Sequence, residues 1–218
     1  MRAGFDRLHP KLAERFSVGL DSGLACIATG TMSRIWHGTA FSTPFLQLGA
    51  SRHILFPEQG NDVPFTIENW PYLDRAGRET VTFNRTFELP RRRRRFDATM
   101  VFDEPTGRLV DYLGTHQHVA ADLTCRADDH GGLVIQSGEQ RFRMRRIDVG
   151  VPALITGQAE VYEWFDDCEG RFHIDVRVTN HWFGPLFGYR GSFTCRYVDL
   201  GQAPTPAVAK PAVEETRI

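Results

Sequence analysis

Regular alternation of apolar and polar side chains is the feature that most constrains how this chain can fold. In Glu79–Leu89, sequence ETVTFNRTFEL, Phe83 and Phe87 lie on the same face as the other apolar residues, and threonines occupy the opposite face. Because successive strand residues point to opposite sides of a sheet, this period predicts a strand with one buried face. Similar alternation in 96–102 and 172–178 predicts further strands of the same kind.

Turn signals separate these runs at short intervals. Segments rich in aspartate and glycine near 74–77, 103–107, 128–132 and 166–170 are typical of hairpin connections. We expect about nine to ten strands, and an antiparallel sheet of that size must close or fold over to hide its edges. The sequence therefore predicts a mainly β fold, an antiparallel, closed or strongly curled, calycin-like β-barrel, which is preferred over a sandwich.

Only one or two short helices are expected, both near the N-terminus. Leu8–Val18 has apolar residues at helical spacing, and a second helix is predicted over Thr43–Leu55. The 218 residues suit one domain. We assign residues 1–200 to a single barrel-like domain. Residues 201–218 combine proline, alanine and charge without an aromatic residue, so we expect a disordered C-terminal tail.

Composition excludes several classes of protein. Lysine plus arginine number 26 against 27 acidic residues, so no global field attracts nucleic acid or anionic lipid. The charged N-terminus lacks a signal-peptide core and no run of about 18 apolar residues occurs, which predicts a cytoplasmic protein without membrane insertion. The four cysteines form no Cys-x-x-Cys pair and are read as free thiols. Arg91–Arg95 is interpreted as a solvated hairpin connection.

Two strands place charges on an apolar face. Arg85 lies between Phe83 and Phe87 and should point inward, where it needs either a core carboxylate or an anionic ligand group. Glu139 and Arg141 continue the apolar stripe of the segment that precedes them. If that face lines the interior, Glu139 pairs with Arg85 or acts as a general base; otherwise the strand leaves the core and becomes solvated.

A histidine pair forms another candidate site. Alternation would put His116, His118 and Asp122 on one side of a strand, an arrangement that can bind a metal. The segment is somewhat similar to the first cupin motif, but its glycine spacing differs, its acid is an aspartate and no later histidine completes the set. We favour two hydrogen-bonded histidines at a barrel mouth. Asp111 could orient either imidazole.

The segment from 180 to 191, NHWFGPLFGYRG, combines three glycines and a proline with aromatic rings. Such rings could line a ligand pocket or form an ordinary apolar plug at the barrel end. The aromatic ligand-binding residues predicted from both regions are Phe83, Phe87, Trp182, Phe187 and Tyr189, and the hydroxyl of Tyr189 offers a polar handle.

Five segments support a family resemblance: VPFTIEN (63–69), FDATM (96–100), DYLGTH (111–116), SGEQRF (137–142) and FGPLFGYRG (183–191). Together they resemble a bacterial family of uncharacterised domains, the domain of unknown function family 4166, over about residues 8 to 197. Its members occur alone, or attached to saccharopine-dehydrogenase-like dinucleotide domains or to YndJ-type membrane segments. The resemblance implies a single domain and a possible dinucleotide-domain protein as partner, and it adds no mechanism.

Three functional hypotheses follow. The preferred one is a barrel that binds a small apolar ligand with a polar group, held by Arg85, Glu139 and Arg141 inside the aromatic lining. The second is an enzyme without a cofactor, an isomerase, cyclase or hydrolase, in which His116 or Glu139 moves a proton, supported by Asp111; it requires these groups to share one cavity with Arg85. The third is an interaction module for a dinucleotide-binding enzyme.

Overall fold

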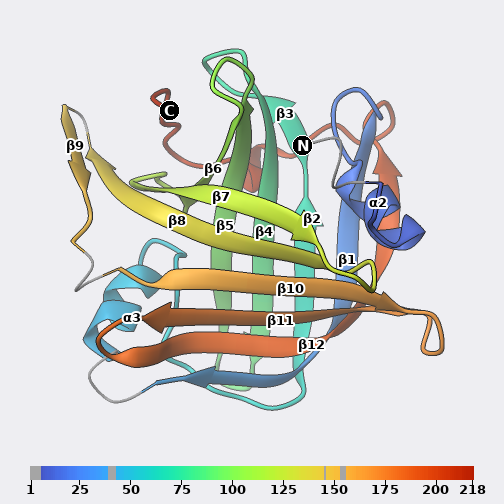
Figure 1. Ribbon diagram of the computed structural model, residues 1–218, viewed down its shortest axis with the longest axis horizontal. Helices are drawn as coiled ribbons and strands as arrows, with labels where there is room; N and C mark the ends of the chain where they lie inside the picture. Colours follow the sequence, from blue (N-terminus) through green and yellow to red (C-terminus); the bar gives the residue numbers. More distant parts are fainter. Residues whose placement is uncertain (1–5, 39–42, 145, 153–155) are drawn as a thin grey trace.

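The computed structural model describes residues 6–38, 43–144, 146–152 and 156–218, and most of them lie in strands (Figure 1). The helices are α2 (Pro10–Phe16), α3 (Thr43–Ala50) and the 3-10 helix η2 (Ala207–Ala209). The strands are β1 (Leu24–His37), β2 (Val63–Asn69), β3 (Pro71–Leu73), β4 (Glu79–Leu89), β5 (Arg92–Asp103), β6 (Arg108–Leu113), β7 (Val119–Ala127), β8 (Leu133–Met144), β9 (Ile147–Gly150), β10 (Gln158–Asp166), β11 (Arg171–Asn180) and β12 (Gly184–Asp199).

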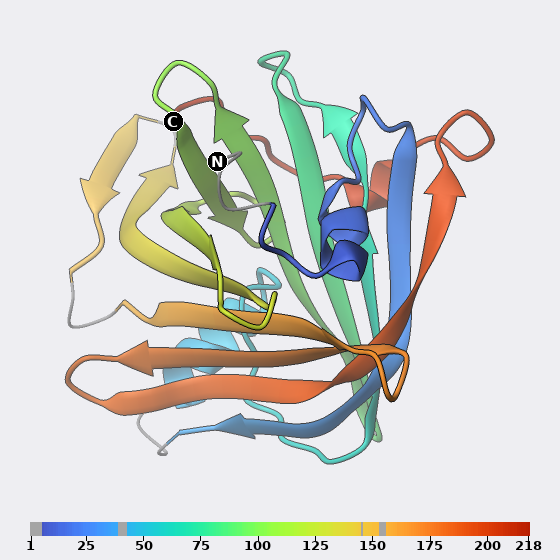
Figure 2. The ribbon, with the colours of Figure 1, turned by 45° about the vertical axis from the view of Figure 1, so that its right-hand side comes forward.

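Ten of the described strands form a closed antiparallel ring in the order β10, β11, β12, β1, β2, β4, β5, β6, β7 and β8. The ring closes where β8 pairs with β10, through only four register pairs between Leu133–Gln136 and Glu160–Glu163. β3 pairs with β4 and β9 pairs with the end of β8, both outside the ring. The prediction of a barrel is therefore confirmed over a sandwich, and Figure 2 shows the strands curving around one interior.

One side of the interior is filled by aromatic rings. Phe56 lies 5.0 Å from Phe87 and 5.0 Å from Phe187, measured between ring centroids. Tyr189 packs edge-on against Phe87 at 5.1 Å, and Phe65 lies 5.0 Å from Phe87. All five side chains are buried. This cluster makes part of the barrel core solid, and the remaining interior is hollow.

The two helices cover different parts of the barrel. α2 starts with a proline in its first turn and buries Leu12 and Arg15 against the barrel end. α3 ends at Ala50, earlier than the predicted end at Leu55. The chain turns at His53, whose φ of 55° is left-handed and incompatible with a continuing helix. No helix within the described ranges has the length and hydropathy needed to cross a lipid bilayer.

The C-terminal segment differs from the expected disordered tail. Residues 201–218 run along the outside of the barrel (Figure 1). Asn84 Nδ2 donates a hydrogen bond of 2.7 Å to the Ala209 carbonyl, and the Tyr112 hydroxyl donates to the Arg217 carbonyl. The segment has too few apolar residues to fold alone, but the outer face of the barrel supplies the donors and apolar surface that order it.

Candidate ligand-binding site

A cavity of about 740 Å³ occupies the hollow part of the barrel. Its walls are mainly apolar side chains from the inner faces of the strands, and α3 with the loop after it contributes the rest. Volumes of about 300–1,000 Å³ are typical of pockets that enclose a small organic ligand. The volume of this cavity falls within that range.

A second cavity of about 940 Å³ lies at the end of the barrel that α2 covers. Its walls include Leu8, Val81, Leu109 and Leu133. Five side chains line both cavities and form a waist between them. The waist residues are Arg15, Phe16, Phe83, Met100 and Ile135.

Arg85 points into the first cavity and is only 7% exposed. Its guanidinium carbon lies 4.8 Å from the ring centroid of Phe96 and 5.6 Å from that of Phe83, which are cation–π contacts. Nη1 makes a long hydrogen bond of 3.4 Å to the Phe83 carbonyl, and Nε has no partner among the described residues. Arg85 therefore does not form the core ion pair, the alternative expected from the sequence, with any of the described residues.

Two more buried polar groups face the same cavity without partners in the described chain, Asp111 Oδ1 on β6 and the Tyr189 hydroxyl on β12. Burial raises the pKa of Asp111 to about 7, and the positive charge of Arg85 opposes this rise. Burial likewise raises the pKa of Tyr189, again opposed by Arg85. The charge of Arg85 thus acts on both groups. Near neutral pH a large fraction of Asp111 is protonated and can donate a hydrogen bond.

The waist contains a buried ion pair that the sequence analysis missed. Arg15 of α2 donates from Nε to Glu163 of β10 and from Nη1 to Asn69 Oδ1 at 3.0 Å. Both charged side chains are almost fully buried, and Glu163 raises the pKa of Arg15 against the effect of desolvation. A signal was present, because Arg15 follows Leu8 and Leu12 on one face of the predicted helix.

The structure places Glu139 and Arg141 outside the barrel, so the inward alternative is wrong for both. On β7 a single residue lies between Ala121 and Leu123, whereas on β8 two residues lie between their partners Gln140 and Ser137. This bulge changes which residues face inward, because an extra residue shifts the alternation by one position. Ser137 and Gln140 line the cavity, Glu139 is exposed, and Arg141 binds Asp148 at 2.8 Å.

His116 and His118 lie at the cavity wall, in the loop between β6 and β7 instead of on a strand. Their ring centroids are 5.6 Å apart, and burial lowers the pKa of both. Thr115 Oγ1 lies 3.0 Å from His116 Nδ1. Asp122 lies on the outer face, where it binds Arg108, so the predicted grouping of three ligands on one strand face is wrong.

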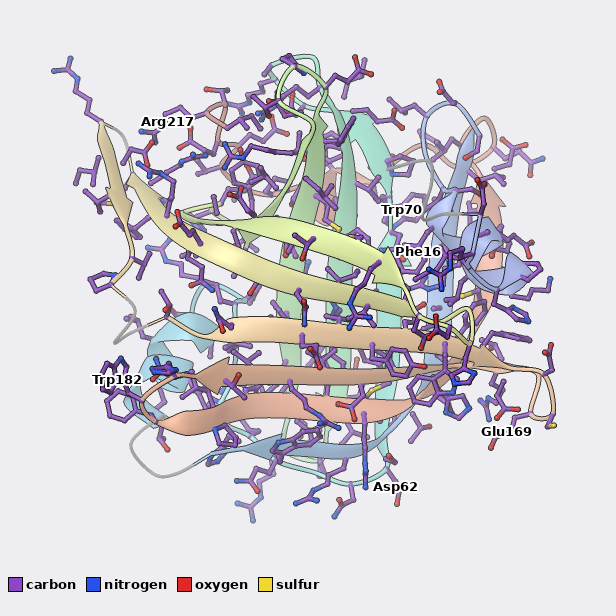
Figure 3. The ribbon with its side chains drawn as sticks, in the orientation of Figure 1. Phe16, Asp62, Trp70, Glu169, Trp182 and Arg217 are labelled. Atoms are coloured by element: carbon purple, nitrogen blue, oxygen red, sulfur yellow. The ribbon has the colours of Figure 1, made fainter. Side chains whose placement is uncertain are left out.

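The predicted aromatic lining is divided between three environments. Phe83 and Tyr189 line the cavity. Phe87 and Phe187 belong to the solid aromatic cluster next to Tyr189. Trp182 is 67% exposed in the turn between β11 and β12, at the edge of the molecule in Figure 3. Turn geometry explains this position, since Asn180 Oδ1 accepts the Trp182 backbone N–H at 2.8 Å.

One group of side chains has ligand atoms close enough to hold a metal ion. Asp166, Glu169 and His173 place one such atom each within 4.8 Å of one another, on the β10–β11 hairpin. His173 Nε2 is already 3.1 Å from Glu169 Oε2, and its ring stacks on Trp164. These contacts account for the cluster without an ion, and it lies apart from the residues that line either cavity.

Comparison with known proteins identifies the family. The family described as Domain of unknown function (DUF4166) matches residues 8–193. This chain belongs to the DUF4166 family. It is also 38% identical over 186 residues to the Uncharacterized protein YndH of Bacillus subtilis (strain 168), which covers 85% of this chain and 90% of that protein. The DUF4166 match begins before α2 and ends within β12, so it includes all or part of every ring strand. Neither description names an activity, so the function of this DUF4166 domain is argued from its cavity.

Proposed function

We propose that the barrel binds a small, largely apolar molecule that carries a polar group. The observation that carries this proposal is a set of three buried polar groups in a cavity with mainly apolar walls. Arg85 Nε, Asp111 Oδ1 and the Tyr189 hydroxyl have no hydrogen-bond partner among the residues that the structure describes. Leaving a buried polar group unsatisfied costs about 1–3 kcal/mol, and more when it is charged. A ligand whose polar group meets these atoms offsets that cost.

The apolar walls favour an organic ligand over water as the occupant. Water can satisfy isolated polar atoms, but it gains little from the apolar surface around them. Removing that surface from water stabilises a complex by roughly 25 cal/mol per Å². Specificity then comes from the few polar groups and affinity from the walls, as in most small-molecule sites.

Replacing the cavity arginine tests the proposal. Purified protein is incubated with a bacterial lipid and metabolite extract and analysed by native mass spectrometry, and the retained molecule is then titrated. Arg85→Met should weaken its binding by roughly 10- to 100-fold, because a charge-assisted hydrogen bond worth about 1.5–3 kcal/mol is lost. The variant should melt no lower than the wild type, since an unpaired buried charge has been removed.

Arg177→Met is the matched control, because Arg177 lies on the exposed face of β11 and pairs with Asp175. It should bind like the wild type. Failure to retain any molecule from the extract, or equal binding by Arg85→Met, would contradict the proposal.

Proton transfer on the bound molecule is a second candidate function. A general base works best with a pKa near the working pH, and the pKa of Asp111 is about 7 in the cavity that also contains Arg85. His116 lines this cavity, whereas Glu139 does not contribute to it. Incubation with ligand in D₂O separates the two functions. Deuterium uptake that Asp111→Asn abolishes indicates catalysis, and retention of the molecule without uptake indicates binding alone.

A further inference from the structure

The charge inside the first cavity distinguishes between classes of polar group. Arg85 has no carboxylate partner among the described residues. Arg15, which also lines the cavity and is similarly buried, is paired with Glu163. With Asp111 protonated, the region around Arg85 carries one uncompensated positive charge. A singly charged anion neutralises it, while a doubly charged group would leave a negative charge buried.

The donors suit a carboxylate in particular. A guanidinium offers paired N–H donors that match the two oxygens of a carboxylate. The Tyr189 hydroxyl and a protonated Asp111 supply further donors that lack partners within the described chain. A carboxylate has about four lone-pair sites, enough to accept hydrogen bonds from several of these donors.

The waist points to the shape of the rest of the ligand. The walls of both cavities are largely apolar, and the five waist side chains are all that the two cavities have in common. Four of these, Phe16, Phe83, Met100 and Ile135, are uncharged and apolar, and Met100 is unbranched and adapts its conformation easily. The charge of Arg15 is already compensated by Glu163. An aliphatic chain that lies along these shared side chains would contact apolar surface and would meet no unpaired charge at the waist.

We infer that the barrel takes a long-chain aliphatic carboxylic acid, with its carboxylate at Arg85 and Tyr189 and its chain extending past the Phe83–Met100–Ile135 waist into the second cavity. This inference rests on the proposed binding function and names its ligand class. It adds two separate requirements, one for the head group and one for the chain length.

The head group should bind in a pH-dependent manner through Asp111. Asp111 interacts electrostatically with Arg85, which lies on the far side of β5, and with Cys125 on β7. Its register partners on β5 and β7 are the apolar residues Met100 and Ala121. An aliphatic acid is ionised throughout the range above pH 5.5. As the pH rises through about 7, Asp111 loses its proton, and it then repels the ligand carboxylate instead of donating to it.

The first experiment measures binding of hexadecanoic acid, hexadecanol, methyl hexadecanoate and hexadecyl phosphate by fluorescence displacement at pH 5.5 and 8.5. The acid should bind roughly tenfold or more tightly than the alcohol and the ester at pH 5.5, and more tightly than the phosphate at pH 8.5, where the phosphate carries two negative charges. The affinity of the acid should fall by roughly tenfold at pH 8.5, and that of the alcohol should not change. Arg85→Met should abolish the preference for the acid, and Asp111→Asn should abolish the pH dependence.

The second experiment varies chain length from octanoic to octadecanoic acid. Ile135→Trp fills the waist, so it should weaken binding of the longest acids by roughly tenfold or more and leave octanoic acid unaffected. Gln136→Trp is the control, because the neighbouring residue points outward from the same strand and is exposed. Met100→Phe narrows the same waist and serves if Ile135→Trp does not give a cooperative melting transition.

The outcomes separate this inference from the proposed function. Equal binding of acid, alcohol and ester overturns the carboxylate assignment while the binding function stands. An unchanged chain-length profile in both waist variants overturns the second requirement. If none of the probes binds and extracts yield another apolar molecule, the ligand class is wrong; if extracts yield nothing either, the proposed function fails as well.

Discussion

Two buried arginines in this barrel have opposite surroundings. Both guanidinium groups lie over two aromatic rings, but Arg15 also binds Glu163 and Asn69, whereas Arg85 has only one long hydrogen bond within the described chain. Removing one partner of a buried ion pair destabilises the fold, because the other charge is left buried and uncompensated. A buried charge without a partner in the native fold already carries this free-energy cost. This difference supports a structural role for Arg15 and the binding role that we propose for Arg85.

Breaking the Arg15–Glu163 pair should reveal its structural role. Glu163→Leu leaves the Arg15 guanidinium buried without its carboxylate and should lower the free energy of unfolding by about 3–5 kcal/mol. Arg15→Met leaves the Glu163 carboxylate buried without its guanidinium and should lower the free energy of unfolding by a similar amount. The double variant should recover most of the loss, because two apolar side chains of similar volume replace the pair. Urea denaturation measures all three, and simple additivity of the two single losses would contradict the assignment.

At this scale the sequence predicts some site residues and misses others. The inward direction of Arg85 follows from its place between Phe83 and Phe87 on a regular strand. Tyr189 is predicted as an aromatic residue with a polar handle, in a segment rich in glycine and aromatic rings. Arg15 and Glu163 meet only because the ring closes and brings α2 beside β10, a long-range contact that local alternation cannot show.

The bulge in β8 shows why strand patterns alone misplace side chains. Continuous alternation from Leu133 to Arg141 predicts that Glu139 and Arg141 point inward, but the extra residue opposite Asp122 shifts the second half of the strand. Gly138 was the available signal, because an isolated glycine within a strand often marks a bulge. The misplacement of Glu139 and Arg141 therefore has one physical cause.

Deleting Gly138 tests this account of the bulge. The deletion removes the extra residue and leaves Ser137 and Gln140 on the inner face, so the domain should still fold, with a melting temperature lower by only a few degrees, at about 2–4 °C per kcal/mol for a chain of this size. Deleting Asp175 is the control, since it lies in regular pairing with both β10 and β12. That deletion reverses the faces of half a strand and should prevent folding. Equal effects of the two deletions, seen by circular dichroism melting, would disprove the account.

Across the whole molecule, the strand count and closure followed from turn spacing and the need to hide edges, and the closed ring of ten strands agrees with them. The path of residues 201–218 could not be predicted in this way. Amino-acid composition indicates whether a segment can fold alone. It does not predict the order of residues 201–218, because the surface of the barrel supplies the contacts that order them. Its last residue, Ile218, packs on the outer cluster of Val101, Val110 and Tyr112. Association with a dinucleotide-domain protein stays a prediction.

Removing residues 201–218 should destabilise the barrel. The truncation exposes the outer apolar cluster to water and deprives Asn84 and Tyr112 of their acceptors. We expect a loss of several kcal/mol in the free energy of unfolding and faster amide exchange in β4 and β6, measured by denaturation and hydrogen exchange. Val208→Ser/Val213→Ser, which alters exposed tail residues, should match the wild type. An unchanged stability of the truncated protein would show that the docked tail contributes nothing.

The short register between β8 and β10 has a mechanical consequence. Four residue pairs close the ring there, while β4 and β5 are joined by ten. Beyond those four pairs, Ser137 Oγ accepts the Ala159 N–H at 2.8 Å, and Gln140 reaches the Gly157 carbonyl at 2.5 Å. Side-chain hydrogen bonds thus continue the contact between β8 and the start of β10 beyond the last backbone pair. The β2–β4 pairing is equally short, with four residue pairs, so we expect the ring to open locally at these two pairings before the longer ones, without unfolding of the remaining wall.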